Sequence, residues 1–181
     1  MYGVRPMCED DIPEVMAIER EAFPGQPPTS PESFQRELRN KLASYLVAYD
    51  GEGTPGARLL GYAGLWFIVD EAHLISLAVR EDARRRGVGE LLLIAALDLA
   101  IQREAQTMTL EVRVSNLPAQ ALYEKYGLGK VGRRRGYYPD NNEDAFLMTV
   151  EAIADAAYQR RLRQLKAAHA ARLGAYQVAL P

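Results

Sequence analysis

The stretch "LISLAVREDARRRGVGELLLIAALDLA", which runs from Leu74 to Ala100, carries the strongest indication of the fold. Its apolar beginning, which ends near Val79, predicts a buried strand. After a short basic loop, the segment from Val88 is apolar around most of its first three helical turns, which predicts a buried helix. A strand joined to a buried helix in this way is typical of an α/β domain.

The segments on either side continue the α/β pattern. An acidic amphipathic segment after Met7 and a second segment capped by Ser30 predict two helices, separated by the proline-rich "PGQPPTSP". The next elements are expected as strands at 44–50, 59–70, 72–80 and 107–114, a helix at 115–127, and two strands around a turn at Pro139–Asn142.

This order predicts two parts in the chain. Residues 1–150 are expected to form one α/β domain with a single mixed central β-sheet flanked by helices. The Ala- and Arg-rich residues 151–181 are expected to form an extra C-terminal helix, acidic first and basic later, which suits a helix dipole. The pattern leaves open whether this helix docks on the domain or pairs two subunits as a homodimer.

Composition excludes several classes of function. The chain has 181 residues, 48% of them hydrophobic, and a net charge of −2, which does not indicate a nucleic-acid or membrane partner. Cys8 is the only cysteine, and His73 and His169 lie far apart, so neither an internal disulfide nor a metal site is expected. The acidic N-terminus and the short apolar run Leu91–Leu97 predict a soluble, cytoplasmic protein.

The basic loop Arg84-x-x-Gly87-x-Gly89 suggests a phosphate site. It opens a helix, whose first backbone N–H groups lack partners and whose dipole favours an anion. Glycine allows the backbone to approach a ligand closely, and Arg84, Arg85 and Arg86 add positive charge. The loop matches neither the P-loop nor the G-x-G-x-x-G motif. On these residues alone, an ordinary loop with solvated arginines remains an equal alternative.

Three later motifs, taken with the loop, resemble the pattern of a known protein family. E-V-R-x-S-N at 111–116, A-L-Y-E at 121–124 and R-R-x-Y-Y-P at 134–139 follow it in order. Together with the loop, they resemble the GNAT acetyltransferases, and specifically the RimI-type enzymes that acetylate the N-terminal alanine of a ribosomal protein. The resemblance covers roughly residues 1–150. It implies the GNAT fold, acetyl-CoA as co-substrate, no metal, and direct attack by the acceptor amine in a ternary complex without an acyl-enzyme.

The resemblance also implies which residues hold acetyl-CoA. In the family, backbone amides of the loop hold the pyrophosphate, and the preceding strand contacts the pantetheine and the thioester carbonyl. The matching positions here are Leu77, Ala78, Val79, Arg84, Arg85, Arg86, Gly87, Val88, Gly89, Glu90 and Asn116. Asn116 is expected in addition to cap the helix that follows it.

Glu111 is the candidate general base. It interrupts a strand whose alternating apolar residues bury the opposite face, so its own face should look toward a cleft. Partial desolvation there is expected to raise the pKa of Glu111 and make it a usable base, directly or through a water. Taken alone, a solvent-exposed glutamate is the favoured interpretation, and the resemblance is what assigns the role of base.

Tyr123 is the candidate general acid. Its helical spacing with Ala119, Leu122 and Tyr126 predicts that the ring packs inward, as a core aromatic residue would. The resemblance assigns to Tyr123 the protonation of the departing CoA thiolate, and Tyr126 is expected to be structural.

The acceptor is less well determined than the donor. The resemblance implies that Pro24, Tyr137 and Tyr138 contact a peptide or protein N-terminus, such as that of a ribosomal protein. In the resembling enzymes a tryptophan usually follows Phe-Pro, where this chain has Gly25, and this departure leaves the peptide preference open. A small amine of the polyamine or aminoglycoside type, or a non-catalytic CoA-binding module, remain alternatives. Acidic residues near Arg133 and its neighbours argue against nucleic acid.

Overall fold

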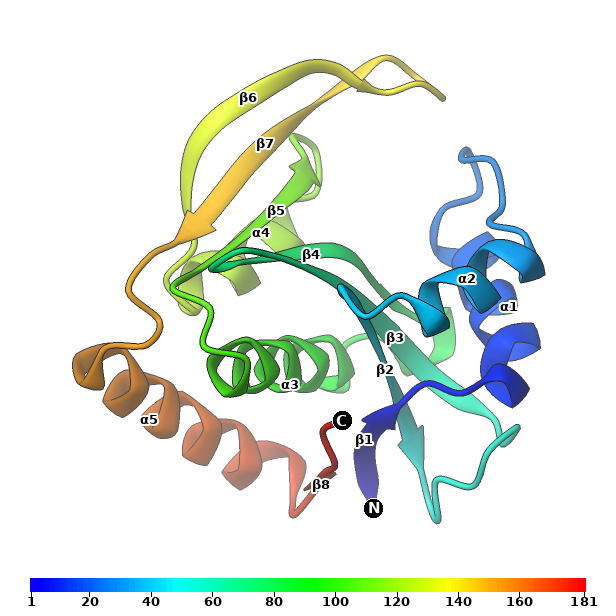
Figure 1. Ribbon diagram of the computed structural model, residues 1–181, viewed down its shortest axis with the longest axis horizontal. Helices are drawn as coiled ribbons and strands as arrows, with labels where there is room; N and C mark the ends of the chain where they lie inside the picture. The colour runs from blue at the N-terminus through cyan, green and yellow to red at the C-terminus, as the bar shows by residue number, and fades with distance from the viewer.

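An eight-stranded mixed β-sheet in the order β6-β7-β5-β4-β3-β2-β1-β8 runs through the computed structural model, which describes residues 1–181 (Figure 1). Helices cover both of its faces, so the expected α/β fold with a single mixed sheet is confirmed. None of the helices is both long and apolar enough to cross a membrane.

The elements follow the predicted order, with additions at both ends of the chain. The strands are β1 Tyr2–Pro6, β2 Ala43–Asp50, β3 Leu59–Ile68, β4 Glu71–Val79, β5 Thr107–Arg113, β6 Gly129–Tyr138, β7 Glu143–Val150 and β8 Gln177–Val178. The helices are α1 Ile12–Ala22, α2 Pro31–Arg39, α3 Val88–Gln102, α4 Leu117–Lys125 and α5 Ala156–Leu173, with short 3-10 turns at Glu9–Asp11 and Glu81–Ala83.

Helix α3 is the centre of the larger of two cores. Its residues Leu91–Leu97 are completely buried, because the sheet covers one side of the helix and α5 packs on another. The second core lies on the opposite face of the sheet, under α1 and α2, and includes Val15, Ile18 and Phe34. The sheet is therefore enclosed by helices over its middle strands, as the apolar pattern of α3 predicted.

Strands β4 and β5 are parallel neighbours that separate early. Only Glu71, Ala72 and His73 of β4 pair with β5. Beyond His73 the two strands diverge, and β5 continues to Arg113 in antiparallel pairing with β7 alone. Residues 74–79 of β4 therefore have an edge whose backbone groups find no partner strand, which opens the sheet in its middle.

The β6–β7 hairpin arches from this opening toward the loop between α1 and α2 (Figure 1). Its turn lies at the predicted position, between Tyr138 and Glu143. The hairpin and the α1–α2 loop therefore face each other across the opening in the sheet.

The sequence pattern did not predict two short strands, β1 and β8. β1 contains only five residues, among them Gly3 and Pro6, and is recognisable only through its pairing with β2. β8 has two residues and pairs in parallel with β1.

The C-terminal helix docks on α3, and Ile153 and Leu162 are buried in the larger core around α3. The division between residues 1–150 and 151–181 stays a prediction.

Glu90 links three helices at the beginning of α3. One of its carboxylate oxygens accepts hydrogen bonds from Lys125 Nζ and Tyr126 Oη, each at 2.6 Å, and the other accepts from Arg172 at 2.8 Å. Burial alone would raise the pKa of Glu90, but these donors outweigh it and hold the pKa below its ordinary value. An ionised carboxylate thus joins α3 to α4 and α5.

Replacing Glu90 with alanine should lower the free energy of unfolding by about 1–3 kcal/mol, because the buried Tyr126 hydroxyl loses its acceptor. Urea denaturation measures the loss. Glu124→Ala is the matched control: its carboxylate is 54% exposed and lies 3.7 Å from Lys130. The control should change stability by less than about 0.5 kcal/mol. Equal losses in the two variants would contradict the linking role of Glu90.

Candidate active site

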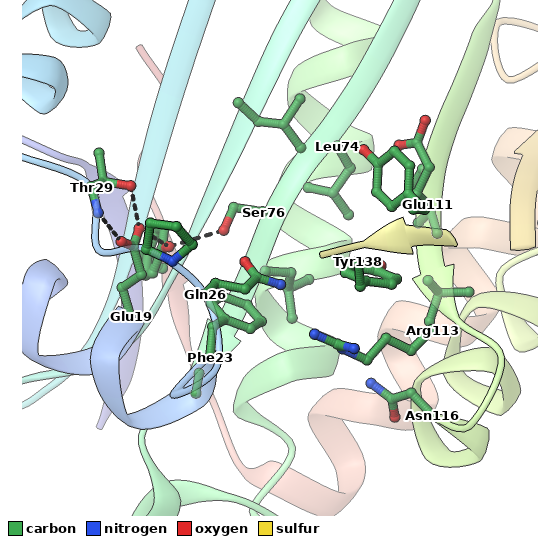
Figure 2. A pocket seen from close by; sticks show the side chains of 18 of the residues that line it. Glu19, Phe23, Gln26, Thr29, Leu74, Ser76, Glu111, Arg113, Asn116 and Tyr138 are labelled. Carbon is green, nitrogen blue, oxygen red and sulfur yellow. Dashed lines mark hydrogen bonds between the residues drawn. The ribbon is translucent and has the colours of Figure 1, made fainter. Parts of the chain in front are cut away.

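A cleft of about 630 Å³ lies where β4 and β5 separate (Figure 2). One wall comes from α1 and the α1–α2 loop, the floor from β4 and β5, and the other wall from α4 and the β6–β7 hairpin. Its lining includes Glu19, Phe23, Gln26, Pro27 and Thr29 on the first wall; Leu74, Ile75, Ser76, Leu77, Leu110, Glu111, Val112 and Arg113 on the floor; and Asn116, Tyr123, Tyr137, Tyr138 and Pro139 on the second wall.

Glu111 borders the cleft and is paired with a histidine. His73 Nε2 lies 2.6 Å from Glu111 Oε2, and Arg134 Nε donates to Glu111 Oε1 at 3.1 Å. The hydrogen bond from His73 is the main cause that holds the pKa of Glu111 below its ordinary value, against the effect of burial. The expected increase in pKa is therefore wrong, and Glu111 is a carboxylate at neutral pH.

His73 is a site residue that sequence reasoning missed. It lies 38 residues before Glu111 and no local spacing connects the two. The parallel pairing of His73 with Thr109 brings them together, because it sets Glu111 two residues further along the neighbouring strand. Only a correct strand register could have revealed this contact.

Tyr123 reaches the same cleft from α4. Its ring packs inward as predicted, with 7% of the residue exposed. Burial raises the pKa of Tyr123 to about 12, so the hydroxyl keeps its proton at physiological pH. Tyr126, one turn further on, is completely buried and bonded to Glu90, as expected of a structural residue. Asn116 caps α4 as predicted, since its Oδ1 accepts from the Ala119 N–H at 3.2 Å.

The loop before α3 has the features of an anion site. The backbone N–H groups of residues 85–90 donate to no protein acceptor, and they surround the N-terminus of a long helix. Arg84, Arg85 and Arg86 are exposed. Free amides, a helix dipole and positive charge fit the pyrophosphate of acetyl-CoA, and the unpaired edge of β4 next to Leu77 fits a chain-like group such as pantetheine.

Two residues of the loop also contact other helices. The Glu90 side chain points toward α4 and α5, so a ligand at the loop meets only its backbone N–H. Gly87 has a φ of +79°, and a Cβ there would lie 3.1 Å from His169 Nε2 on α5. The missing side chain at Gly87 therefore makes room for α5, whereas the sequence suggested room for a ligand.

The tyrosine pair at the hairpin end lines the cleft. Tyr137 and Tyr138 pack edge to face with ring centroids 5.0 Å apart. The Arg113 guanidinium lies 3.9 Å from the Tyr138 ring centroid and holds Asp140 with two hydrogen bonds of 3.0 Å. The hairpin turn is thus fixed to the end of β5.

The α1–α2 loop reaches the hairpin turn. Gly25 packs so closely on the Asp140 side chain that a Cβ at this position would collide with it. The absence of a side chain at Gly25 therefore allows the loop and the turn to touch above the cleft. Pro24 is not among the lining residues, whereas Phe23 and Gln26 are.

Glu19 is a second site residue that the sequence did not indicate. Its carboxylate accepts from the Thr29 N–H at 2.6 Å, from Thr29 Oγ1 at 2.8 Å and from Tyr62 Oη at 3.2 Å. Ser76 Oγ in turn donates to Tyr62 Oη at 2.9 Å (Figure 2). This network fixes a negative charge on the wall opposite Glu111. No group of three or more potential ligand side chains is arranged to hold a metal ion.

Comparison with known proteins identifies related chains. Residues 12–128 match the model of the acetyltransferase (GNAT) family. A Bacillus subtilis protein provisionally named a ribosomal protein bS18-alanine N-acetyltransferase is 41% identical over 150 residues, which are 82% of this chain and 94% of that one. The Escherichia coli ribosomal protein bS18-alanine N-acetyltransferase is 33% identical over 152 residues, which are 83% of this chain and 97% of that one.

Solved structures agree with the sequence relatives. The crystal structure of the Escherichia coli enzyme matches with a TM-score of 0.73 and 30% identity, and the match covers 84% of this chain and 94% of that chain. Arabidopsis thaliana NAA60 in complex with acetyl-CoA matches with a TM-score of 0.72 over 83% of this chain and 98% of that chain. At 19% identity, the second match concerns the fold alone.

Replacing His73 with alanine should raise the pKa of Glu111, because the hydrogen bond from His73 is the largest cause that lowers it. A pH titration followed by ¹³C NMR of the glutamate carboxyl groups measures the change, and Glu111→Gln identifies the signal by its loss. Because the folded-state pKa is depressed, the stability from Glu111 is present above its unfolded pKa and is lost as pH falls through its folded pKa. In His73→Ala that contribution should be smaller, and its loss should be complete at a higher pH. An unchanged or lower pKa would contradict the pairing.

Proposed function

This chain belongs to the GNAT acetyltransferase family and is an N-acetyltransferase of the RimI-like type, and from that premise we propose its reaction. It moves the acetyl group of acetyl-CoA to the N-terminal α-amine of a protein, by direct attack within a ternary complex. Glu111 and Tyr123 border the same cleft, beside the unpaired edge of β4, and this juxtaposition carries the proposal. Bound acetyl-CoA supplies the thioester whose acetyl group is transferred.

The donor is held mainly by backbone groups. The free N–H groups at the start of α3 bind the pyrophosphate, with Arg84, Arg85 and Arg86 adding charge. The edge of β4 from Leu77 to Val79 binds the pantetheine and polarises the thioester carbonyl through backbone N–H groups. Asn116 lines the cleft near this edge and is available for a further contact.

Glu111 removes the proton of the acceptor amine. An α-amine has a pKa of about 7.7–8.0, so most of it is protonated at neutral pH. The lowered pKa of Glu111 makes it a weak base toward a resting ammonium group, but the attacking nitrogen becomes far more acidic as its bond to carbon forms. A fixed, fully ionised carboxylate is then the right acceptor. His73 is a positioning residue, because its hydrogen bond holds the Glu111 carboxylate in place.

Tyr123 stabilises the departing thiolate. Its phenol keeps its proton up to about pH 12, so it is a hydrogen-bond donor throughout the physiological range. A donor that faces the cleft from the helix opposite β4 lowers the cost of negative charge on the leaving sulfur and can deliver the proton. Cys8 lies outside the cleft lining and has no part in the reaction.

The acceptor is a protein N-terminus that enters between the α1–α2 loop and the hairpin. Tyr137, Tyr138 and Phe23 offer aromatic surface there, and Glu19 offers negative charge that favours a cationic amine. The bacterial relatives act on ribosomal protein bS18, as their names state, which makes an alanine-starting ribosomal protein the first acceptor to test. Such an acceptor is cytoplasmic, and we expect the enzyme to act there.

Replacing Glu111 with glutamine should lower kcat by about 10²–10⁴-fold, since the base is lost while the shape of the site is kept. Tyr123→Phe should also lower kcat, with little change in the KM for acetyl-CoA. Thiol release from acetyl-CoA with an alanine-starting peptide measures both. Tyr126→Phe is the control from the same helix, expected to keep kcat within a few fold. Wild-type rates in Glu111→Gln would remove the base from the mechanism.

Mass spectrometry of peptides and small amines incubated with enzyme and acetyl-CoA tests the acceptor class. We expect acetylation at the α-amine of alanine-starting peptides, and Tyr138→Ala should raise the KM for the peptide far more than the KM for acetyl-CoA. Acetylation of polyamines or amino sugars alone would refute a protein acceptor. Tight CoA binding without turnover of any amine would favour a binding module.

A further inference from the structure

The C-terminal helix α5 contacts the loop before α3 directly, through His169. This residue is 1% exposed, and its Nε2 lies 3.0 Å from the Gly87 carbonyl oxygen. The same oxygen accepts the Leu91 N–H at 3.0 Å, as the first hydrogen bond of α3. Two donors from different helices therefore fix the orientation of the Gly87 carbonyl.

Gly87 is shaped to receive α5. Its φ of +79° lies in the left-handed region, and a Cβ would stand 3.1 Å from His169 Nε2 and 3.3 Å from Leu173 Cδ1. Either constraint alone favours glycine. Because glycine has no side chain, α5 can lie directly against the backbone of the loop at Gly87.

The contact has a consequence for the next N–H group. In a planar trans peptide unit, the C=O of one residue and the N–H of the next point in opposite directions. Since the Gly87 C=O is held on the side of α5, the Val88 N–H points away from α5. That N–H has no protein acceptor, and it belongs to the set proposed to bind the pyrophosphate.

The imidazole of His169 is energetically unfavourable in one respect, because one of its nitrogens is buried without a hydrogen-bond partner. Because Nε2 donates to Gly87, Nδ1 is an acceptor, and Nδ1 is buried without a partner. Burial lowers the pKa of His169, with Glu90, Lys125 and Arg172 as the charged groups nearby. A leucine would fill the same space with no unpaired polar atom. What the imidazole adds is the hydrogen bond to Gly87, together with an edge contact to the Tyr176 ring, whose centroid lies 5.4 Å away.

Arg172 makes a second link, one turn along the same face of α5. It donates to Glu90 at 2.8 Å, so α5 holds both Gly87 and the third residue of α3. Helix α5 lies beyond residues 12–128, the part matched by the family model, so this support is supplied by the chain's own C-terminal segment.

We propose that His169 is a positioning residue for acetyl-CoA: through its bond to Gly87, the C-terminal helix holds the loop in the shape that presents its N–H groups to the pyrophosphate. This inference rests on the proposed use of acetyl-CoA. His169 touches neither substrate nor reacting atoms.

The test compares His169→Leu, which removes the donor, with His169→Gln, whose side-chain amide can still donate near the position of Nε2. We expect the Kd for CoA, measured by calorimetry, to rise about three- to tenfold in His169→Leu, the effect of losing one hydrogen bond. His169→Gln should recover much of it. Lys166→Ala is the control on the same helix, because Lys166 pairs with Asp98 at 2.6 Å, away from the loop. Its Kd should equal that of the wild type.

A second acetyl donor distinguishes a positioning role of His169 from a general disruption of the active site. S-acetylpantetheine lacks the pyrophosphate, so its kcat/KM should be the same in His169→Leu and wild type. If His169→Leu does not fold, His169→Asn, which is too short to reach Gly87, takes its place. Unchanged CoA affinity in a folded variant, or equal losses with both donors, would overturn the role of His169. Failure of the wild type to bind CoA would instead overturn the proposed function.

Discussion

The separation of β4 from β5 after three residue pairs is the constraint on which the rest of the site depends. The paired part sets the register that brings His73 to Glu111. The unpaired part leaves a strand edge free to bind a substrate by backbone hydrogen bonds. Because both strands end in loops that lead to helix N-termini, the same separation places the start of α3, which is the proposed anion site, and the capped start of α4 on either side of one cleft. A sheet paired along its whole length would have no free edge on β4 and no cleft between the two strands.

Three carboxylates, those of Glu19, Glu90 and Glu111, are held by donors from other elements. Glu111 is held by β4 and β6, Glu19 by the α1–α2 loop and β3, and Glu90 by α4 and α5. For Glu111 and Glu90 these donors outweigh burial and keep the pKa low. In the proposed mechanism, proton transfer therefore depends on where an ionised carboxylate is fixed, and an unusually basic side chain is not required.

Local features could be predicted from the sequence, and contacts between distant segments could not. The burial of α3, the inward Tyr123 and the caps at Ser30 and Asn116 depend on spacing within one element, and all were confirmed. The His73–Glu111 pair, the resulting pKa and the short strands β1 and β8 depend on pairing between distant segments. Gly87 belongs to both classes: its position in a loop motif was recognised, but its contact with α5 required the fold.

The most direct measurement is a crystal structure of the enzyme with a bisubstrate analogue, in which CoA is joined through an acetyl bridge to an alanine-starting peptide. The account predicts the peptide nitrogen within hydrogen-bonding reach of Glu111, directly or through one water, and the sulfur within reach of the Tyr123 hydroxyl. The pyrophosphate should lie on the N–H groups of the loop before α3. An analogue bound elsewhere, or with its nitrogen and sulfur remote from these two side chains, would contradict the account.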